Sequence, residues 1–365
     1  MIDREESGIA GHGAPRRAPW PVLSSDVPPV AGRLKEQVED FVVEEIPAYL
    51  PCGEGEHLFL WIEKRDVSVD FLKRHLVRTL ELAPRDLGMA GIKDRRAVTR
   101  QWISVPRHVE AKVDRIDTDS IRLLDARPHR NKLKTSHLKG NRFSILLRAE
   151  RSAEASERIE RVAWVLRTLG VPNYYGTQRF GRHGATVADG LRLLRGERLR
   201  GGRLPGWKRR FLLSAVQSWL FNESLAERLR EGTLHRVLPG DVMQVRASGG
   251  LFVCEDTATD QARLDRREIV PTGPLFGPKM RSAAGRVREA EEALLRSAGI
   301  DRASFERHKK LVPGARRPHL IWPERLDVIP QAEGWRFELT LPAGSYATVA
   351  IREFTKEEFA APDLP

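Results

Sequence analysis

Cysteine is scarce in this chain, since its 365 residues include only Cys52 and Cys254. The two are far apart and no CxxC pair occurs, which excludes a zinc ribbon and leaves a disulfide framework without support. No apolar run approaches the length that spans a bilayer, and the N-terminus lacks the basic-then-apolar layout of a secretory signal. We therefore expect a cytoplasmic protein in a reducing compartment, without a membrane partner.

Several common catalytic motifs are also missing. The sequence has no Walker loop, no dinucleotide-binding glycine fingerprint, no GxSxG elbow and no HExxH pair, so NTPase, dehydrogenase, hydrolase and zinc-protease functions lack support. The ten histidines are dispersed, and the spacing of His129 and His137 in a basic segment is not a standard metal-ligand spacing. We expect neither a metal nor a cofactor.

Positive charge is what the chain has in excess. Lys and Arg number 62 against 50 Asp and Glu, which gives a net charge of +12 and a pI of about 10.0. Such a surplus attracts polyanions, and a nucleic acid is the partner that fits best. Hydrophobic residues make up 41% of the chain, enough to build a sizeable core.

The order of periodic segments predicts a sheet domain that is interrupted by a second domain. Strand-like alternation occurs at residues 40–47, 57–65 and 142–149, and it returns at "WRFELTLP" and "YATVAIREF" near the C-terminus. Helical patterns dominate the long segment between them. We therefore predict three parts: a flexible leader over residues 1–30, a discontinuous domain over 31–170 plus 318–358, and an inserted domain over 171–317.

Two amphipathic helices are predicted before the inserted domain. Ser68 is the expected N-cap of the first, whose apolar face comprises Phe71, Leu72, His75, Leu76 and Leu80. The second covers residues 152–169 and ends at Gly170, with an apolar stripe of Ile159, Val162, Ala163, Leu166 and Leu169.

The stretch "AGIKDRRAVTRQWISV", residues 90–105, places a single acid among bases. Asp94 follows Lys93 and precedes Arg95 and Arg96, and the stretch ends in strand-like alternation. An aspartate in such a loop is most often a solvent-exposed ion pair. The alternative is a reactive carboxylate that nearby cations keep ionised, while the same cations hold the phosphates of a nucleic acid.

A second stretch, "NYYGTQRFGRHG" at residues 173–184, interleaves aromatic residues with Arg179 and Arg182 and is broken by glycines. Aromatic rings offer stacking surfaces to bases, and arginines offer contacts to phosphates. The alternative is a tight loop between domains whose aromatic residues pack in a core.

The stretch around Asp94 resembles the signature of the tRNA pseudouridine synthase D (TruD) family. Other stretches resemble blocks of that family and occur in the family's order: "VPNYYGTQRFGRHG", "SAVQSWLFN", "VPTGPLFG", "GARRP" and "LPAGSYATVAIREF". The resemblance implies isomerisation of uridine to pseudouridine in tRNA, at uridine 13 of the D arm, by a monomeric, cofactor-free enzyme that flips the base. It implies an α+β fold, in which a pseudouridine-synthase domain with a mixed, largely antiparallel sheet is interrupted by an inserted α/β TRUD domain.

The resemblance also implies roles for individual residues. Asp94 matches the catalytic aspartate, and Lys35 matches a basic residue expected to pair with it. Some family members have Phe where this chain has Tyr346. The residues expected around the uridine are Phe41, Asn141, Phe143 and Tyr346, and those expected to hold the RNA backbone are Arg95, Arg96, Arg179 and Arg182.

Two other functions fit part of the sequence. A non-catalytic RNA-binding or RNA-chaperone protein accounts for the basic charge and the aromatic loop, but not for an acid that repels phosphate. A hydrolase with Asp94 as its base lacks a second acid or a metal ligand at a sensible spacing. For an isomerase the residues leave three routes open: Asp94 attacks C1′, adds to C6 of the ring, or removes a C2′ proton.

Overall fold

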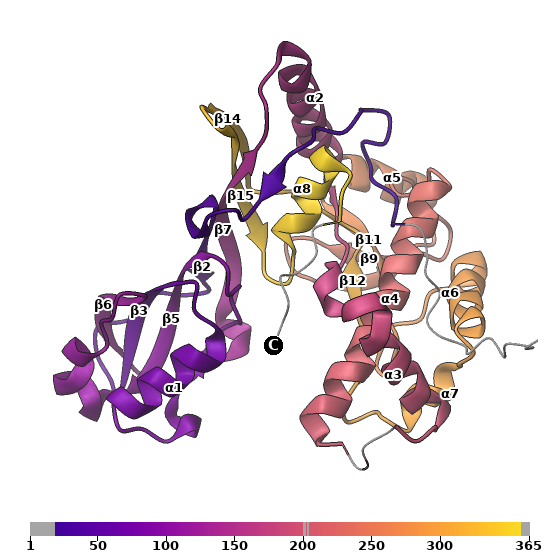
Figure 1. Cartoon of the computed structure of the whole chain (residues 1–365). Helices are drawn as coiled ribbons and strands as arrows, with labels where there is room; N and C mark the ends of the chain where they lie inside the picture. The colour runs from indigo at the N-terminus through magenta and orange to yellow at the C-terminus, as the bar shows by residue number, and fades with distance from the viewer. Residues whose placement is uncertain (1–18, 200–201, 203, 359–365) are drawn as a thin grey trace, which may run out of the picture. The chain divides into compact units, whose positions relative to one another are not determined.

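The computed structural model describes residues 19–199, 202 and 204–358, which form two compact units (Figure 1). The sheet unit contains residues 23–171 and 321–358, and the insert unit contains the described residues of 19–22 and 172–320. The chain therefore changes unit after Val22, after Val171 and after Leu320, and the last two lie close to the predicted ends of the inserted domain at 171 and 317. The short strands β8 (Val171–Pro172) and β13 (Leu320–Ile321) form a two-stranded sheet.

The sheet unit is built on one nine-stranded sheet with the main order β14-β15-β7-β2-β5-β3-β6, and with β1 on β7 and β4 on β5. All its pairings are antiparallel except that of β2 with β5, which joins the two halves of the sheet. The strands are β1 (Arg33–Leu34), β2 (Phe41–Pro47), β3 (His57–Arg65), β4 (Gly88–Met89), β5 (Val98–Pro106), β6 (Ile121–His129), β7 (Leu138–Arg148), β14 (Arg325–Gln331) and β15 (Gly334–Pro342).

Three α-helices and four 3₁₀ segments complete the sheet unit. The α-helices are α1 (Val69–Thr79), α2 (Ala153–Leu169) and α8 (Ala347–Thr355). The 3₁₀ segments are Val38–Asp40, Pro84–Asp86, Arg107–Arg115 and Thr135–His137. Helices α2 and α8 pack on the half of the sheet that contains β7 and β15, and α1 packs on the half that contains β3 and β5. Each half therefore has its own apolar core.

The insert unit combines helices with a four-stranded antiparallel sheet of order β10-β9-β11-β12. Its core is made mainly by α3, α4 and α6 and the segments around Phe276 and Phe305. The elements are 3₁₀ turns at Thr177–Arg179 and Arg182–Gly184, α3 (Ala185–Arg195), α4 (Gly206–Arg230), β9 (Val242–Val245), β10 (Leu251–Val253), α5 (Thr257–Asp265), β11 (Ile269–Leu275), α6 (Gly285–Ser297), α7 (Arg302–Glu306) and β12 (Ala315–Pro318).

The predicted fold class is confirmed, because the chain is α+β with a mixed, largely antiparallel main sheet. Both predicted helix starts are also correct, since Ser68 and Ser152 accept hydrogen bonds from the first turns of α1 and α2. Two residues of the predicted apolar faces are exposed, Phe71 at 49% and Leu169 at 38%. No helix among the described residues is long and apolar enough to cross a membrane.

Two sequence interpretations are wrong. The segment "YATVAIREF" is not a strand, because residues 347–355 form α8. A short apolar run fits both periods, and the buried residues Ala347, Ala350, Ile351 and Phe354 recur at helical spacing. The prediction of a flexible leader over residues 1–30 is also wrong for its last residues, because Val27 and Val30 are buried in the sheet unit. Residues 1–18 lie outside the described residues.

Candidate active site

Three strand ends meet where the two halves of the sheet join. β2 begins at Phe41 and β5 at Val98, and these two parallel strands start at the same edge of the sheet. β3 runs antiparallel to β5 and ends there, with Lys64 opposite Thr99. The loop that leads into β5 carries Asp94, so the topology itself brings the acid to this edge.

Lys35 is the partner of the Asp94 carboxylate. Its Nζ lies 3.2 Å from Oδ2, and the two side chains are 16% and 34% exposed. The same ammonium lies 3.9 Å from the centroid of the Phe41 ring in a cation–π contact. Lys35 has a φ of +57°, a left-handed conformation that costs a residue with a side chain about 1–2 kcal/mol. Such strain tends to cluster at functional sites.

Lys64 holds the backbone of the same loop. Its Nζ donates to the carbonyl oxygen of Asp94 at 2.6 Å, and the residue is fully buried. Burial lowers the pKa of Lys64 to about 8, although the charges of Asp94 and Asp66 act in the opposite direction. Sequence reasoning missed this residue. The available signal was a lysine near the end of the otherwise apolar strand "HLFLWIEKR".

Lys93 turns inward to a buried acid. Its Nζ lies 3.0 Å from Oε2 of Glu45, and both side chains are almost completely buried. Burial raises the pKa of Glu45, while the charge of Lys93 opposes that shift. Glu45 was not predicted either. Lys93 forms its ion pair with Glu45. The neighbouring Asp94 is instead contacted by Lys35 at its carboxylate and by Lys64 at its backbone carbonyl.

Two of the three aromatic residues expected beside the uridine lie in the core. Phe41 is 1% and Phe143 is 7% exposed, and their ring centroids are 6.3 Å apart in an edge-to-face arrangement. The Lys35 ammonium covers the Phe41 ring, so a base that stacks there has to displace it. Stacking of a base on Phe41 or Phe143 stays a prediction.

The other two expected pocket residues lie near one end of β7 and β15. Asn141 is paired with Glu45 of β2 and with Leu341 of β15. Its Oδ1 is buried and has no hydrogen-bond partner among the described residues. Tyr346 is half-buried and precedes α8, in the turn that follows β15. Asn141 lies on the same face of the sheet as Phe41, because Phe41 is opposite Ile145, four residues along β7.

The four arginines expected to bind RNA fall into two groups. Arg95 and Arg96 flank Asp94. The Nε of Arg95 lies 3.7 Å from Asp66 Oδ1, and Arg96 donates to the carbonyl oxygen of Glu36 at 3.2 Å. Arg179 and Arg182 belong to the insert unit, where Arg179 donates to Ser214 Oγ at 2.9 Å.

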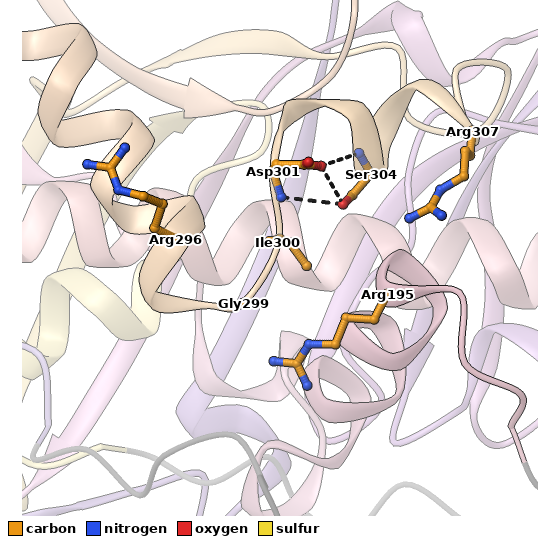
Figure 2. Close-up of a pocket in the computed structure, with 7 residues that line it drawn as sticks. All are labelled: Arg195, Arg296, Gly299, Ile300, Asp301, Ser304 and Arg307. Carbon is orange, nitrogen blue, oxygen red and sulfur yellow. Dashed lines mark hydrogen bonds between the residues drawn. The ribbon is translucent and has the colours of Figure 1, made fainter.

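A cavity of about 450 Å³ lies in the insert unit and contains none of the predicted site residues (Figure 2). Asp301 and Ser304 face one another there in a helix cap. Two of its arginines close helix ends, since Arg195 donates to the carbonyl oxygen of Ala298 and Arg307 to that of Leu194. These contacts give the polar lining a structural role. The described residues include no group of three or more His, Cys, Asp or Glu positioned for a metal ion.

Comparison with known proteins assigns the chain to a family. The sequence matches the family model for tRNA pseudouridine synthase D (TruD) over residues 20–200 and 202–354. It is 42% identical over 348 residues to a tRNA pseudouridine synthase D of Anaeromyxobacter dehalogenans, covering 94% of this chain and 98% of the relative. It is also 42% identical over 342 residues to that of Thermus thermophilus, covering 93% of each.

A solved structure shares the fold. The crystal structure of a TruD chain from Methanosarcina mazei superposes with a TM-score of 0.73 at 24% identity, covering 92% of this chain and 96% of that one. The family match spans nearly all described residues, and it includes the Asp94 loop and both segments of the sheet unit. The chain therefore belongs to the tRNA pseudouridine synthase D (TruD) family.

Proposed function

We propose that this protein isomerises uridine to pseudouridine in tRNA, at uridine 13 of the D arm, with Asp94 as its catalytic residue and without a cofactor. The observation that carries the proposal is the position of Asp94, where Lys35 contacts the carboxylate and Lys64 holds the backbone carbonyl. Both relatives named above are tRNA pseudouridine synthases. We further propose that it acts as a cytoplasmic monomer.

The isomerisation is balanced within the substrate. The C1′–N1 bond breaks, the base turns, and a C1′–C5 bond forms, while C5 loses a proton and N1 gains one. One carboxylate can assist by adding to C1′ or to C6, or by taking a proton from C2′. Lys35 contacts Oδ2 of Asp94, and the side chain is one-third exposed. Oδ1 is therefore the oxygen that faces the reacting sugar or base.

The two lysines supply what such a carboxylate needs, which is a fixed direction. Misplacement of a reacting group by about 1 Å can cost about 100-fold in rate. Lys64 fixes the main chain of Asp94 and Lys35 fixes its side chain, so the direction of the carboxylate does not depend on the loop alone.

The target uridine has to leave its stack to reach Asp94, at a cost of a few kcal/mol. Stacking on an aromatic ring returns about 1–3 kcal/mol per base. In the proposed complex Phe41, Phe143 and Tyr346 are the rings that supply this stacking. Arg95 and Arg96 hold the flanking phosphates beside Asp94, and Arg179 and Arg182 of the insert unit hold the tRNA body.

Replacement of Asp94 tests the function directly. With unmodified tRNA transcript, we expect wild-type protein to convert uridine 13, detected as a carbodiimide-dependent stop of reverse transcription. Asp94→Asn keeps the shape and the exposed position of the side chain, so binding of the transcript is retained while the stop disappears.

Either of two results contradicts the proposal. Turnover by Asp94→Asn shows that the carboxylate is not required. Binding without any pseudouridine in the wild-type reaction identifies the protein as a non-catalytic RNA-binding protein instead. A stop of reverse transcription at another uridine would support the pseudouridine synthase activity but contradict uridine 13 as the target.

A further inference from the structure

Three neutral side chains on the face of the sheet beside Asp94 have buried polar atoms that lack hydrogen-bond partners among the described residues. They are Thr99 at Oγ1, Gln101 at both Oε1 and Nε2, and Asn141 at Oδ1. Thr99 and Gln101 are fully buried. Buried polar groups in folded proteins are almost always hydrogen-bonded, so a cluster of unsatisfied ones requires an explanation.

The sheet register places this cluster beside the candidate active site. Thr99 lies opposite Lys64 of β3, whose ammonium binds the carbonyl oxygen of Asp94. Gln101 is two residues further along β5 and so shares the face of Thr99. Asn141 lies opposite Glu45, whose carboxylate binds Lys93, the residue before Asp94.

The cluster also lies between the two apolar cores of the sheet unit. On one side the core contains Phe41, Val43 and Phe143, and on the other side it contains Leu60, Ile62 and Ile103. On this face of the sheet, the residues on either side of the cluster are therefore apolar, and the residues of the cluster between them are polar. Apolar residues would fill the middle at no hydrogen-bonding cost, so polar residues there point to a ligand that uses them.

We propose that Gln101 and Thr99, together with Asn141, form the subsite that reads the edge of the flipped uracil. This inference rests on the proposed function. The uracil edge presents O4, N3–H and O2, which are an acceptor, a donor and an acceptor. Gln101 Nε2 and the Thr99 hydroxyl can donate to the two carbonyl oxygens of the base, and either Gln101 Oε1 or Asn141 Oδ1 can accept from N3–H.

The chemistry of the isomerisation suits a fixed reader of this kind. When the base turns about the axis through N3 and C6, O2 and O4 exchange places while N3–H keeps its position. The substrate and the product therefore present the same order of acceptor, donor and acceptor. One set of protein groups can bind the base before and after the turn without rearrangement.

Substitution by apolar residues separates this role from a structural one. Gln101→Leu and Thr99→Val remove hydrogen-bonding groups that the described structure does not use. We therefore expect each melting temperature to be unchanged or raised. We expect kcat/KM with unmodified tRNA transcript to fall by about 10- to 100-fold, the size of a lost substrate hydrogen bond.

The chain offers a matched control for each variant. Gln217 is also buried, but its Nε2 donates to the carbonyl oxygen of Phe276 at 2.6 Å. Thr272 is also buried, and its Oγ1 donates to the carbonyl oxygen of Val242 at 2.6 Å. Gln217→Leu and Thr272→Val should lower the melting temperature and leave kcat/KM unchanged below the transition.

Two outcomes overturn the inference. If Gln101→Leu and Thr99→Val lower the melting temperature as much as their controls do, the side chains are structural. If they keep both stability and kcat/KM, the groups do not read the base. In either case a wild-type protein that forms pseudouridine leaves the proposed function intact, whereas an inactive wild-type protein overturns both.

Discussion

Both units bury charged groups, but they satisfy them in different ways. In the insert unit Arg228 binds Asp241 through two hydrogen bonds, with Nη1 2.6 Å from Oδ1 and Nη2 3.1 Å from Oδ2. Arg316 binds both oxygens of Glu291 in the same forked manner. In the sheet unit Arg148 holds the buried Asp40 in the same forked manner, but Asp94 and Glu45 are each held by a lysine through a single contact.

The difference distinguishes ion pairs that stabilise the fold from a carboxylate that is available to a substrate. An arginine fork occupies both oxygens of a carboxylate and fixes its plane. A lysine is a point charge that contacts one oxygen and leaves the other available. Around Asp94 the neutral polar groups of Thr99 and Gln101 are unused as well. In the insert unit the two arginine forks use both oxygens of their acids for the fold, whereas Asp94 keeps one oxygen outside its lysine contact.

The largest effect on stability is expected when a buried arginine–carboxylate pair is broken. Arg228→Met leaves the fully buried Asp241 without its cation, and an uncompensated buried charge costs about 3–5 kcal/mol of stability. Urea denaturation should show this loss. As a control, Arg288→Met breaks an exposed pair with Glu292 in α6 and should cost about 0.5 kcal/mol or less. Equal losses from the two variants would contradict the comparison.

At Lys64 we expect an effect on the reaction rate. Lys64→Met replaces a buried ammonium by an apolar side chain of similar length, which cores tolerate. The Asp94 loop loses its main-chain anchor, so kcat should fall by about 10- to 100-fold while KM for tRNA stays the same. Lys112→Met, which breaks a surface pair with Glu81 in the same unit, is the control. A change in KM alone would show that Lys64 binds RNA and does not position Asp94.

The pH dependence of stability should show the lowered pKa of Lys64. Burial lowers the pKa of Lys64 to about 8 in the folded protein, against an ordinary value of 10.5, so between these pH values the unfolded chain binds more protons. Stability relative to Lys64→Met should therefore increase as pH rises from 8 toward 10.5, by up to about 1.4 kcal/mol per pH unit. Denaturation of both proteins at pH 7.5, 8.5 and 9.5 measures the difference. A flat difference would show that Lys64 keeps its ordinary pKa.

Much of the sheet could be predicted from sequence because its strands alternate clearly. The periodicity located β2, β3, β7 and β15 and the start of α2. It failed at α8, where a run of nine residues fits either period. It also failed at residues 23–30, whose burial depends on α8: the backbone N–H of Ser24 donates to the carboxylate of Glu353, 329 residues away. Such a contact has no local signal.

Residues of the candidate site could be predicted only where a sequence motif or the family resemblance pointed to them. Asp94 was singled out by its position among basic residues and then by the family resemblance, Lys35 came from the resemblance alone, and the structure brings the two into contact. Lys64, Glu45 and Gln101 lie on strands, and which of their neighbours they face depends on the pairing of β2 with β5. A parallel pairing between distant strands cannot be seen in either strand alone. Phe143 packs in the apolar core, and its expected stacking on the base stays a prediction.

The smallest effect is expected at Arg95, the exposed charge beside Asp94. Its contact with Asp66 is 3.7 Å long, and both side chains are more than half exposed, so Arg95→Gln should change stability by less than about 0.5 kcal/mol. If Arg95 holds one phosphate, the slope of log K against log salt for tRNA binding should decrease by about 1. The control is Arg161→Gln. Arg161 lies on α2 and forms an exposed ion pair with Asp26, so this variant removes one positive charge elsewhere in the sheet unit. Equal slopes for the two variants would mean that net charge, and not the position beside Asp94, determines binding.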